Sequence, residues 1–148
     1  MTAPGGSADV LVVRRLLPAP REDVFAAWLD PTSLARWMCP GRVERATAEV
    51  EPRVGGKFRI VMMRTQGEGA EHRGEYLAID PPSLLSFTWI SDATDLIPTV
   101  VTIELFERGA ETELVLTHRR IPTASVESHR AGWTDIVRKL GEVLTRPA

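Results

Sequence analysis

The hydrophobic pattern of this chain changes period, and that change limits the folds it can form. Between residues 57 and 119, apolar residues recur mostly at every second position, which is the spacing of strands with one buried face. From about Ser125 to Leu144 they recur at three and four residues, which is the spacing of one helix face. Strands with a single apolar face need a cover. Only this last helix is long enough to supply one.

Proline and glycine residues mark turns that divide the rest of the chain into short elements. Pro20 and the pair Asp30-Pro31 each predict the start of a short helix. Sequential hairpins predict antiparallel pairing. The sequence therefore predicts an α+β fold, with a curved seven-stranded antiparallel sheet around a long C-terminal helix and two short helices after the first strand. The predicted strands are Val10–Leu17, Ala46–Glu51, Lys57–Arg64, His72–Ile79, Leu84–Ser91, Thr99–Glu107 and Thr112–Arg119.

Length and charge narrow the class of protein. The chain has 148 residues, enough for one domain, which we place at residues 9–146 after a disordered stretch at 1–8. A net charge of −2 gives no reason to expect a nucleic-acid partner. No apolar run has the length of a membrane span, and residues 1–8 lack the features of a signal peptide. We therefore expect a cytoplasmic protein with neither a nucleic-acid nor a membrane partner.

The inward-facing positions of the predicted strands form the candidate binding site. Trp133 and Ile136 on the last helix, and Trp37 on the second short helix, would face the same interior. Two interpretations stay open, because such residues form a hydrophobic core and can equally form the wall of a ligand cavity. The strand positions are Phe58, Ile60, Met62, Phe87, Trp89, Val101, Ile103, Leu114 and Leu116.

Three polar side chains are candidates to orient a ligand in that interior. His118 shares a face with Leu114 and Leu116, and His129 lies on the apolar stripe of the last helix. A buried imidazole needs a hydrogen-bond partner, so each histidine is favoured as a structural residue. The sharper hypothesis is that both, with Tyr76, anchor a ligand. The alternation around Tyr76 leaves its inward facing open, and His72 is expected at the surface.

Other chemistry finds little support in the sequence. The histidines lack the spacing of a metal site, and no nucleophile-elbow motif is present. Cys39 is the only cysteine, so it can form no disulfide within the chain. Gly132, in mid-helix, is expected to leave room for packing or for a cavity. We predict no catalytic residue, no metal and no tightly bound cofactor.

The order of these motifs resembles the helix-grip superfamily of START domains, birch-type pollen allergens and polyketide cyclases. Within it, the chain is similar to the branch named for the activator of Hsp90 ATPase, in its short bacterial form. The resemblance covers about residues 10–144, and each motif alone is weak. The matching residues are Ala19-Pro20, Val24-Phe25, Trp28, Asp30-Pro31, Trp37, Pro40, Gly55-Gly56-Lys57-Phe58, Gly74-Glu75-Tyr76, Pro81-Pro82, Phe87-Thr88-Trp89, Thr112, Leu114, Leu116-Thr117-His118 and Gly132-Trp133.

The resemblance implies binding of a small hydrophobic molecule in a cavity between the sheet and the C-terminal helix. One alternative is a cyclase or hydrolase acting on an apolar or aromatic substrate, but we expect binding rather than catalysis. Another is a module that binds an Hsp90-type chaperone. The Hsp90-activating members carry a separate N-terminal domain with an asparagine-rich motif, and this sequence contains neither. The oligomeric state stays open, with a homodimer among the alternatives.

Overall fold

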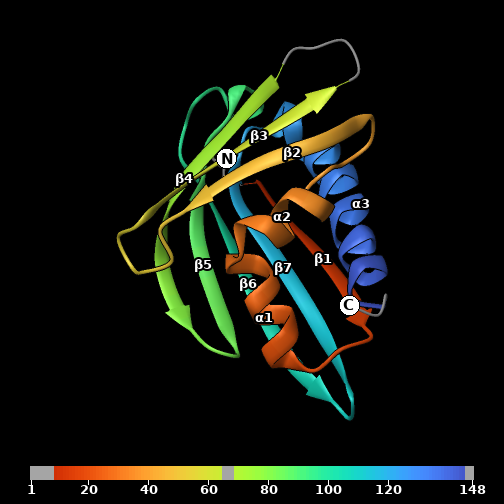
Figure 1. Ribbon diagram of the computed structural model, residues 1–148. Coiled ribbons are helices and arrows are strands. Elements are labelled where there is room, and N and C mark those ends of the chain that lie inside the picture. The colour runs from red at the N-terminus through yellow and green to blue at the C-terminus, as the bar shows by residue number, and fades with distance from the viewer. Residues whose placement is uncertain (1–8, 65–68, 146–148) are drawn as a thin grey trace.

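A single antiparallel sheet forms the body of the protein (Figure 1). The computed structural model describes residues 9–64 and 69–145. The predicted disorder at 1–8, residue 146 of the predicted domain, and residues 65–68 between β3 and β4 lie outside the described residues. The strands are β1 (Asp9–Leu17), β2 (Val43–Val50), β3 (Lys57–Arg64), β4 (Gly69–Asp80), β5 (Leu84–Trp89), β6 (Thr99–Arg108) and β7 (Glu111–Ile121).

The strand order is β1-β7-β6-β5-β4-β3-β2, so strands β2 to β7 form one continuous meander. Strand β1 closes the order by pairing with β7, and β1 and β2 are the two edges. The helices are α1 (Arg21–Leu29), α2 (Pro31–Trp37) and α3 (Val126–Thr145), with single turns η1 (Asp92–Thr94) and η2 (Thr123–Ser125). Figure 1 shows α3 running along one side of the curled sheet, with α1 and α2 close together beside it. The predicted fold class is confirmed.

The strands bury the faces that their sequence alternation predicts. On β3, Phe58, Ile60 and Met62 are buried while Lys57 and Arg59 are exposed. Strands β5 and β6 alternate in the same way, whereas β7 is buried without alternation from Leu114 to His118. Helix α3 adds Trp133, Ile136 and Leu140 to the same continuous core. The predicted cap of α2 is also present, because the Asp30 carboxylate accepts a hydrogen bond from the Thr32 backbone N–H at 2.9 Å.

A bulge in β4 resolves the ambiguous facing of Tyr76. Tyr76 pairs with Phe87 and Ala78 pairs with Ser86, which leaves Leu77 as an extra residue in the strand. Tyr76 is buried and Leu77 is exposed. After the bulge, Ile79 pairs with the buried Leu85 and packs against the core. The extra residue therefore lets Tyr76 and Ile79 both face inward, although their odd spacing would place them on opposite faces of a regular strand.

Two glycines have opposite surroundings, which the sequence does not reveal. A Cβ at Gly74, on the buried face of β4, would lie 1.9 Å from the Thr88 carbonyl oxygen and 2.7 Å from the Phe58 ring. A Cβ at Gly132, in α3, would find only the Pro40 Cβ, at 3.9 Å. The expectation that Gly132 leaves necessary space is therefore wrong, because an alanine fits there in ordinary contact.

This contrast predicts opposite effects of one substitution on the free energy of unfolding. Gly74→Ala should lower it by about 3 kcal/mol, since the clash is with backbone and ring atoms that cannot move aside. Gly132→Ala should raise it by roughly 0.5–1 kcal/mol, because glycine loses more backbone entropy in a helix. Urea unfolding followed by circular dichroism measures both. Equal effects of the two variants would contradict the packing described for Gly74.

Candidate functional site

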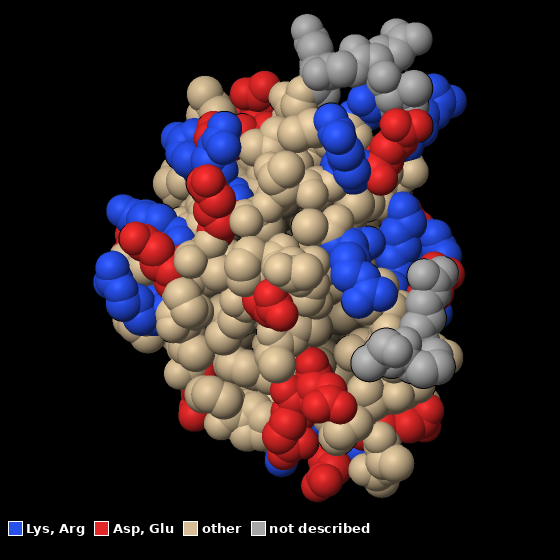
Figure 2. Space-filling model, in the orientation of Figure 1, with Lys and Arg blue, Asp and Glu red and all other residues tan. Residues whose placement is uncertain are grey.

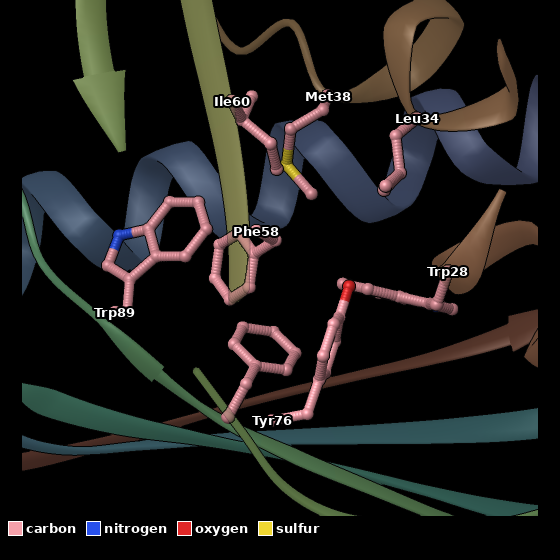
Figure 3. A pocket seen from close by; sticks show the side chains of 8 residues that line it. Trp28, Leu34, Met38, Phe58, Ile60, Tyr76 and Trp89 are labelled. Carbon is pink, nitrogen blue, oxygen red and sulfur yellow. The ribbon is translucent and has the colours of Figure 1, made fainter. Parts of the chain in front are cut away.

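The candidate site is an apolar pocket between the two short helices and the central strands. Eight side chains line it (Figure 3), and they come from α1, α2 and its C-cap, β3, β4 and β5. None of the eight comes from α3, although that helix passes behind the pocket. The lining residues are Trp28, Leu34, Met38, Phe58, Ile60, Tyr76, Phe87 and Trp89.

This position differs from the predicted one. The sequence places the cavity between the sheet and the C-terminal helix, but that space is occupied by packed side chains. The Trp133 ring, from α3, lies 4.9 Å from the Trp89 ring and 6.4 Å from the Trp28 ring, so aromatic side chains occupy the space between helix and sheet. The pocket is displaced from α3 toward α1 and α2.

The pocket is nearly closed in this conformation. Its cavity volume is about 10 Å³, which is room for about one water molecule. A site for a drug-sized ligand has roughly 300–1,000 Å³. The aromatic rings account for the difference, since Phe58 lies 5.3 Å from Phe87 and 6.1 Å from Trp89, centroid to centroid. A ligand larger than a water molecule therefore needs part of the wall to move.

The structure brings some of the predicted site residues together and leaves others elsewhere in the core. Phe58, Ile60, Tyr76, Phe87 and Trp89 line the pocket. His129 is half-buried, and its Nδ1 lies 2.8 Å from the Ser125 carbonyl oxygen. The other predicted residues are buried but are not part of the pocket lining: Trp37, Met62, Val101, Ile103, Leu114, Leu116, His118, Trp133 and Ile136.

His118 belongs to a buried chain of hydrogen bonds rather than to the pocket. The Trp133 indole N–H donates to His118 Nδ1 at 3.0 Å, which places the imidazole proton on Nε2. That N–H donates to Thr99 Oγ1 at 2.7 Å, and the Thr99 hydroxyl donates to the Trp89 carbonyl oxygen at 2.6 Å. Every polar atom of the imidazole therefore has a partner. Burial, and secondarily the charge of nearby His129, lower the pKa of His118 to about 3.

Three lining residues and one histidine were missed or misplaced by sequence reasoning. Trp28, Leu34 and Met38 line the pocket from the short helices, where helical spacing alone does not distinguish a pocket wall from core. His72 was expected at the surface, but its ring packs 5.0 Å from the Trp89 ring, and burial lowers its pKa. His72 is two residues from Gly74 and four from Tyr76 on β4, and residues at such even spacing share a face of a strand, which could have placed it inward.

The segment that carries Met38 is tied to α3 by polar contacts. The Asp135 carboxylate accepts a hydrogen bond from the Gly41 backbone N–H at 2.7 Å. The Lys139 ammonium donates to the Cys39 carbonyl oxygen and lies 3.7 Å from Asp135. Cys39 itself is buried, and this burial raises the pKa of its thiol. We call residues 38–42 with their contacts to Asp135 and Lys139 the α2–α3 latch.

One class of site and one class of segment do not occur among the described residues. Residues 9–64 and 69–145 hold no group of three His, Cys, Asp or Glu side chains placed to bind a metal ion. Within the same ranges, no helix combines the length and the apolar character that crossing a membrane requires.

The buried state of His118 predicts a pH dependence of stability. Its folded pKa, about 3, lies below the usual 6.5, so the unfolded chain binds a proton first as pH falls. Above about pH 6.5, His118 does not make the free energy of unfolding depend on pH. Below that pH, the protonation of His118 in the unfolded chain lowers the free energy of unfolding by about 1.4 kcal/mol per pH unit. His118→Asn should be less stable at pH 7 but show a shallower decline between pH 6 and 4 in urea unfolding. His72→Asn is the control for the second histidine with a lowered pKa. An unchanged slope in His118→Asn would contradict this account.

Comparisons with known proteins show which family and which solved structures this chain resembles. The family model described as Activator of Hsp90 ATPase homolog 1-like protein matches residues 18–145. None of the curated proteins compared with the chain matched it. Among solved structures, protein CV1439 from Chromobacterium violaceum is 26% identical with a TM-score of 0.82, covering 93% of this chain and 98% of that one.

Two further structures show the range of similar proteins. An HSP90 activator from Plasmodium falciparum, PFC0360w, is 25% identical with a TM-score of 0.75, covering 93% of this chain and 97% of that one. CalU16 from Micromonospora echinospora is 23% identical with a TM-score of 0.72, covering 98% and 82%. The family match spans most of the sequence and agrees with the sheet, the short helices and the long final helix. The chain belongs to the family of Activator of Hsp90 ATPase homolog 1-like proteins.

Proposed function

We propose that this protein binds a small hydrophobic molecule in the pocket beneath α1 and α2. The observation that carries the proposal is the contrast between the two walls of this pocket. The sheet wall consists of Phe58, Ile60, Tyr76, Phe87 and Trp89, on strands held by continuous ladders of hydrogen bonds. The opposite wall comes from short helices outside the sheet, so it can move without breaking a ladder.

The chemistry of the movable wall suits an adaptable apolar contact. Met38 has a flexible, polarizable side chain that adjusts to ligands of different shape. Leu34, on α2, lies beside it in Figure 3. On the face that carries α1 and α2, uncharged side chains cover much of the surface between separate acidic and basic groups, one acidic group lying near the centre (Figure 2).

Catalysis is the weaker alternative on this geometry. A cyclase or hydrolase needs at least two polar groups converging on the substrate. Among the described residues, Tyr76 is the one ionisable side chain in the pocket lining. Burial raises its pKa to about 12, which keeps the phenol neutral. His118, which lies outside the pocket lining, has both ring nitrogens hydrogen-bonded, one to Trp133 and one to Thr99.

Protein partners stay predictions. The similar protein from Plasmodium falciparum is described as an HSP90 activator, and the likeness to it is distant. Association with an Hsp90-type chaperone is tested by a pull-down with purified chaperone, and a homodimer by sedimentation at several concentrations.

Ligand binding has a direct test. Native mass spectrometry of the freshly purified protein should show a copurified small molecule, and naphthalene titration should shift the NMR signals of Ile60 and Met38. Leu34→Phe fills the pocket and should abolish both results while the fold is kept. Leu77→Phe places the same side chain type on the exposed face of β4 and should change neither. Shifts confined to residues outside the pocket would contradict the proposed location.

The α2–α3 latch should control the movement of the wall. Asp135→Asn and Lys139→Met weaken the contacts that hold residues 38–42, and these partly exposed interactions contribute on the order of 1 kcal/mol. We expect about fivefold faster amide exchange at Gly41 and faster association of naphthalene. Arg130→Gln removes a surface ion pair with Glu127 on the same helix and is the control. Equal exchange rates in all variants would show that this segment is not the moving wall.

A further inference from the structure

The Tyr76 hydroxyl is a polar group without a partner inside an apolar pocket. Its ring packs 5.4 Å from Phe58 and 6.3 Å from Phe87, centroid to centroid, and the residue is only 2% exposed. Figure 3 shows the hydroxyl extending toward Trp28 and Leu34 across the pocket. Within residues 9–64 and 69–145 no side chain or backbone group forms a hydrogen bond with this oxygen. This oxygen is not among the fully buried side-chain atoms without a partner, so the pocket leaves it accessible to a bound molecule.

Trp28 brings a second unpaired polar group to the same lining. Its indole N–H is fully buried and has no hydrogen-bond partner among the described residues. Two other buried tryptophans do have partners, since the Trp37 N–H donates to Ser33 Oγ at 2.9 Å and the Trp133 N–H donates to His118. Buried tryptophans usually find such a partner. The lining of this small pocket thus includes the fully buried, unpaired Trp28 N–H and the Tyr76 hydroxyl, which forms no hydrogen bond among the described residues.

The pocket also lacks charge. None of its eight lining residues is Asp, Glu, Lys, Arg or His. An ionised ligand would lose its hydration without gaining a counter-ion, which is costly in a buried site. A pure hydrocarbon would leave the Tyr76 hydroxyl and the Trp28 N–H as they are, without partners.

We propose that the ligand is a neutral, mainly apolar molecule carrying one hydrogen-bonding oxygen, such as a ketone, ester or alcohol. The Tyr76 hydroxyl donates to this oxygen, and the Trp28 N–H supplies a second donor from the opposite wall. The inference rests on the proposed function, because it names the chemistry of a ligand for the same pocket. It also explains why positions 76 and 28 carry hydrogen-bond donors, although phenylalanine could fill either position.

Three probes of matched size test this chemistry. Acetophenone and α-methylstyrene differ only in replacing the carbonyl oxygen by a methylene group, and benzoate adds a charge. For the unaltered protein, NMR titration should give acetophenone about tenfold tighter binding than α-methylstyrene, with benzoate weakest. Tenfold corresponds to about 1.4 kcal/mol.

Variants locate the preference in the two donors. Tyr76→Phe and Trp28→Phe should each reduce the preference for acetophenone while α-methylstyrene still binds. Trp37→Phe is the matched control, because the Trp37 ring lies 4.7 Å from Trp28 and its N–H is already paired with Ser33. That variant should keep the preference.

Other outcomes overturn the inference in different ways. Equal binding of acetophenone and α-methylstyrene to the unaltered protein would mean that water satisfies the donors, and binding by a hydrophobic pocket would still stand. Tightest binding of benzoate would overturn the requirement for a neutral ligand. If none of the three probes binds, the proposed function fails and this inference fails with it. The comparison in the unaltered protein decides even if a variant does not fold.

Discussion

The hydrogen bond from the Trp133 indole to His118 joins the long helix to the sheet, and much of the interior depends on it. Through Thr99 it continues to the Trp89 backbone, so one buried chain connects α3 with β7, β6 and β5. Trp133 and Trp89 in turn set the position of the aromatic rings behind the pocket. A neutral imidazole can accept on one nitrogen and donate on the other, which neither a hydrophobic residue nor a charged histidine can do. The helix is held by this polarity as well as by apolar burial.

Much of the fold could be predicted from the sequence because the spacing of apolar residues indicates the elements and the positions of proline and glycine indicate where they end. The alternation of Phe58, Ile60 and Met62 and the stripe of Trp133, Ile136 and Leu140 determine which faces are buried. The bulge at Leu77 could not be predicted, since one extra residue leaves no signature in composition. The space around Gly74 and Gly132 depends on neighbours that are distant in sequence, so the sequence gives no sign of their difference.

The candidate site was predicted less well, for a physical reason. Sequence alternation shows which side chains face inward, but not whether they meet. His118 of β7 and Trp89 of β5 both meet Trp133 of α3 in the core, whereas the pocket-lining residues of β3, β4 and β5 share the pocket with Trp28, Leu34 and Met38 from the short helices and the C-cap of α2. The volume left between aromatic rings depends on their tilt and distance, which only the coordinates supply. A hollow was predicted, and the rings reduce it to about 10 Å³.

The extra residue in β4 has a consequence for how this pocket can vary among sequences. Tyr76 and Ile79 lie on opposite sides of Leu77 and follow separate alternations of the same strand. Losing Leu77 would make the spacing between Tyr76 and Ile79 even, so both would still face inward in a regular strand. The bulge is thus a property of the outer face of β4, where Leu77 is exposed. A sequence without it can keep the same inward residues at the pocket wall and at the far end of the strand.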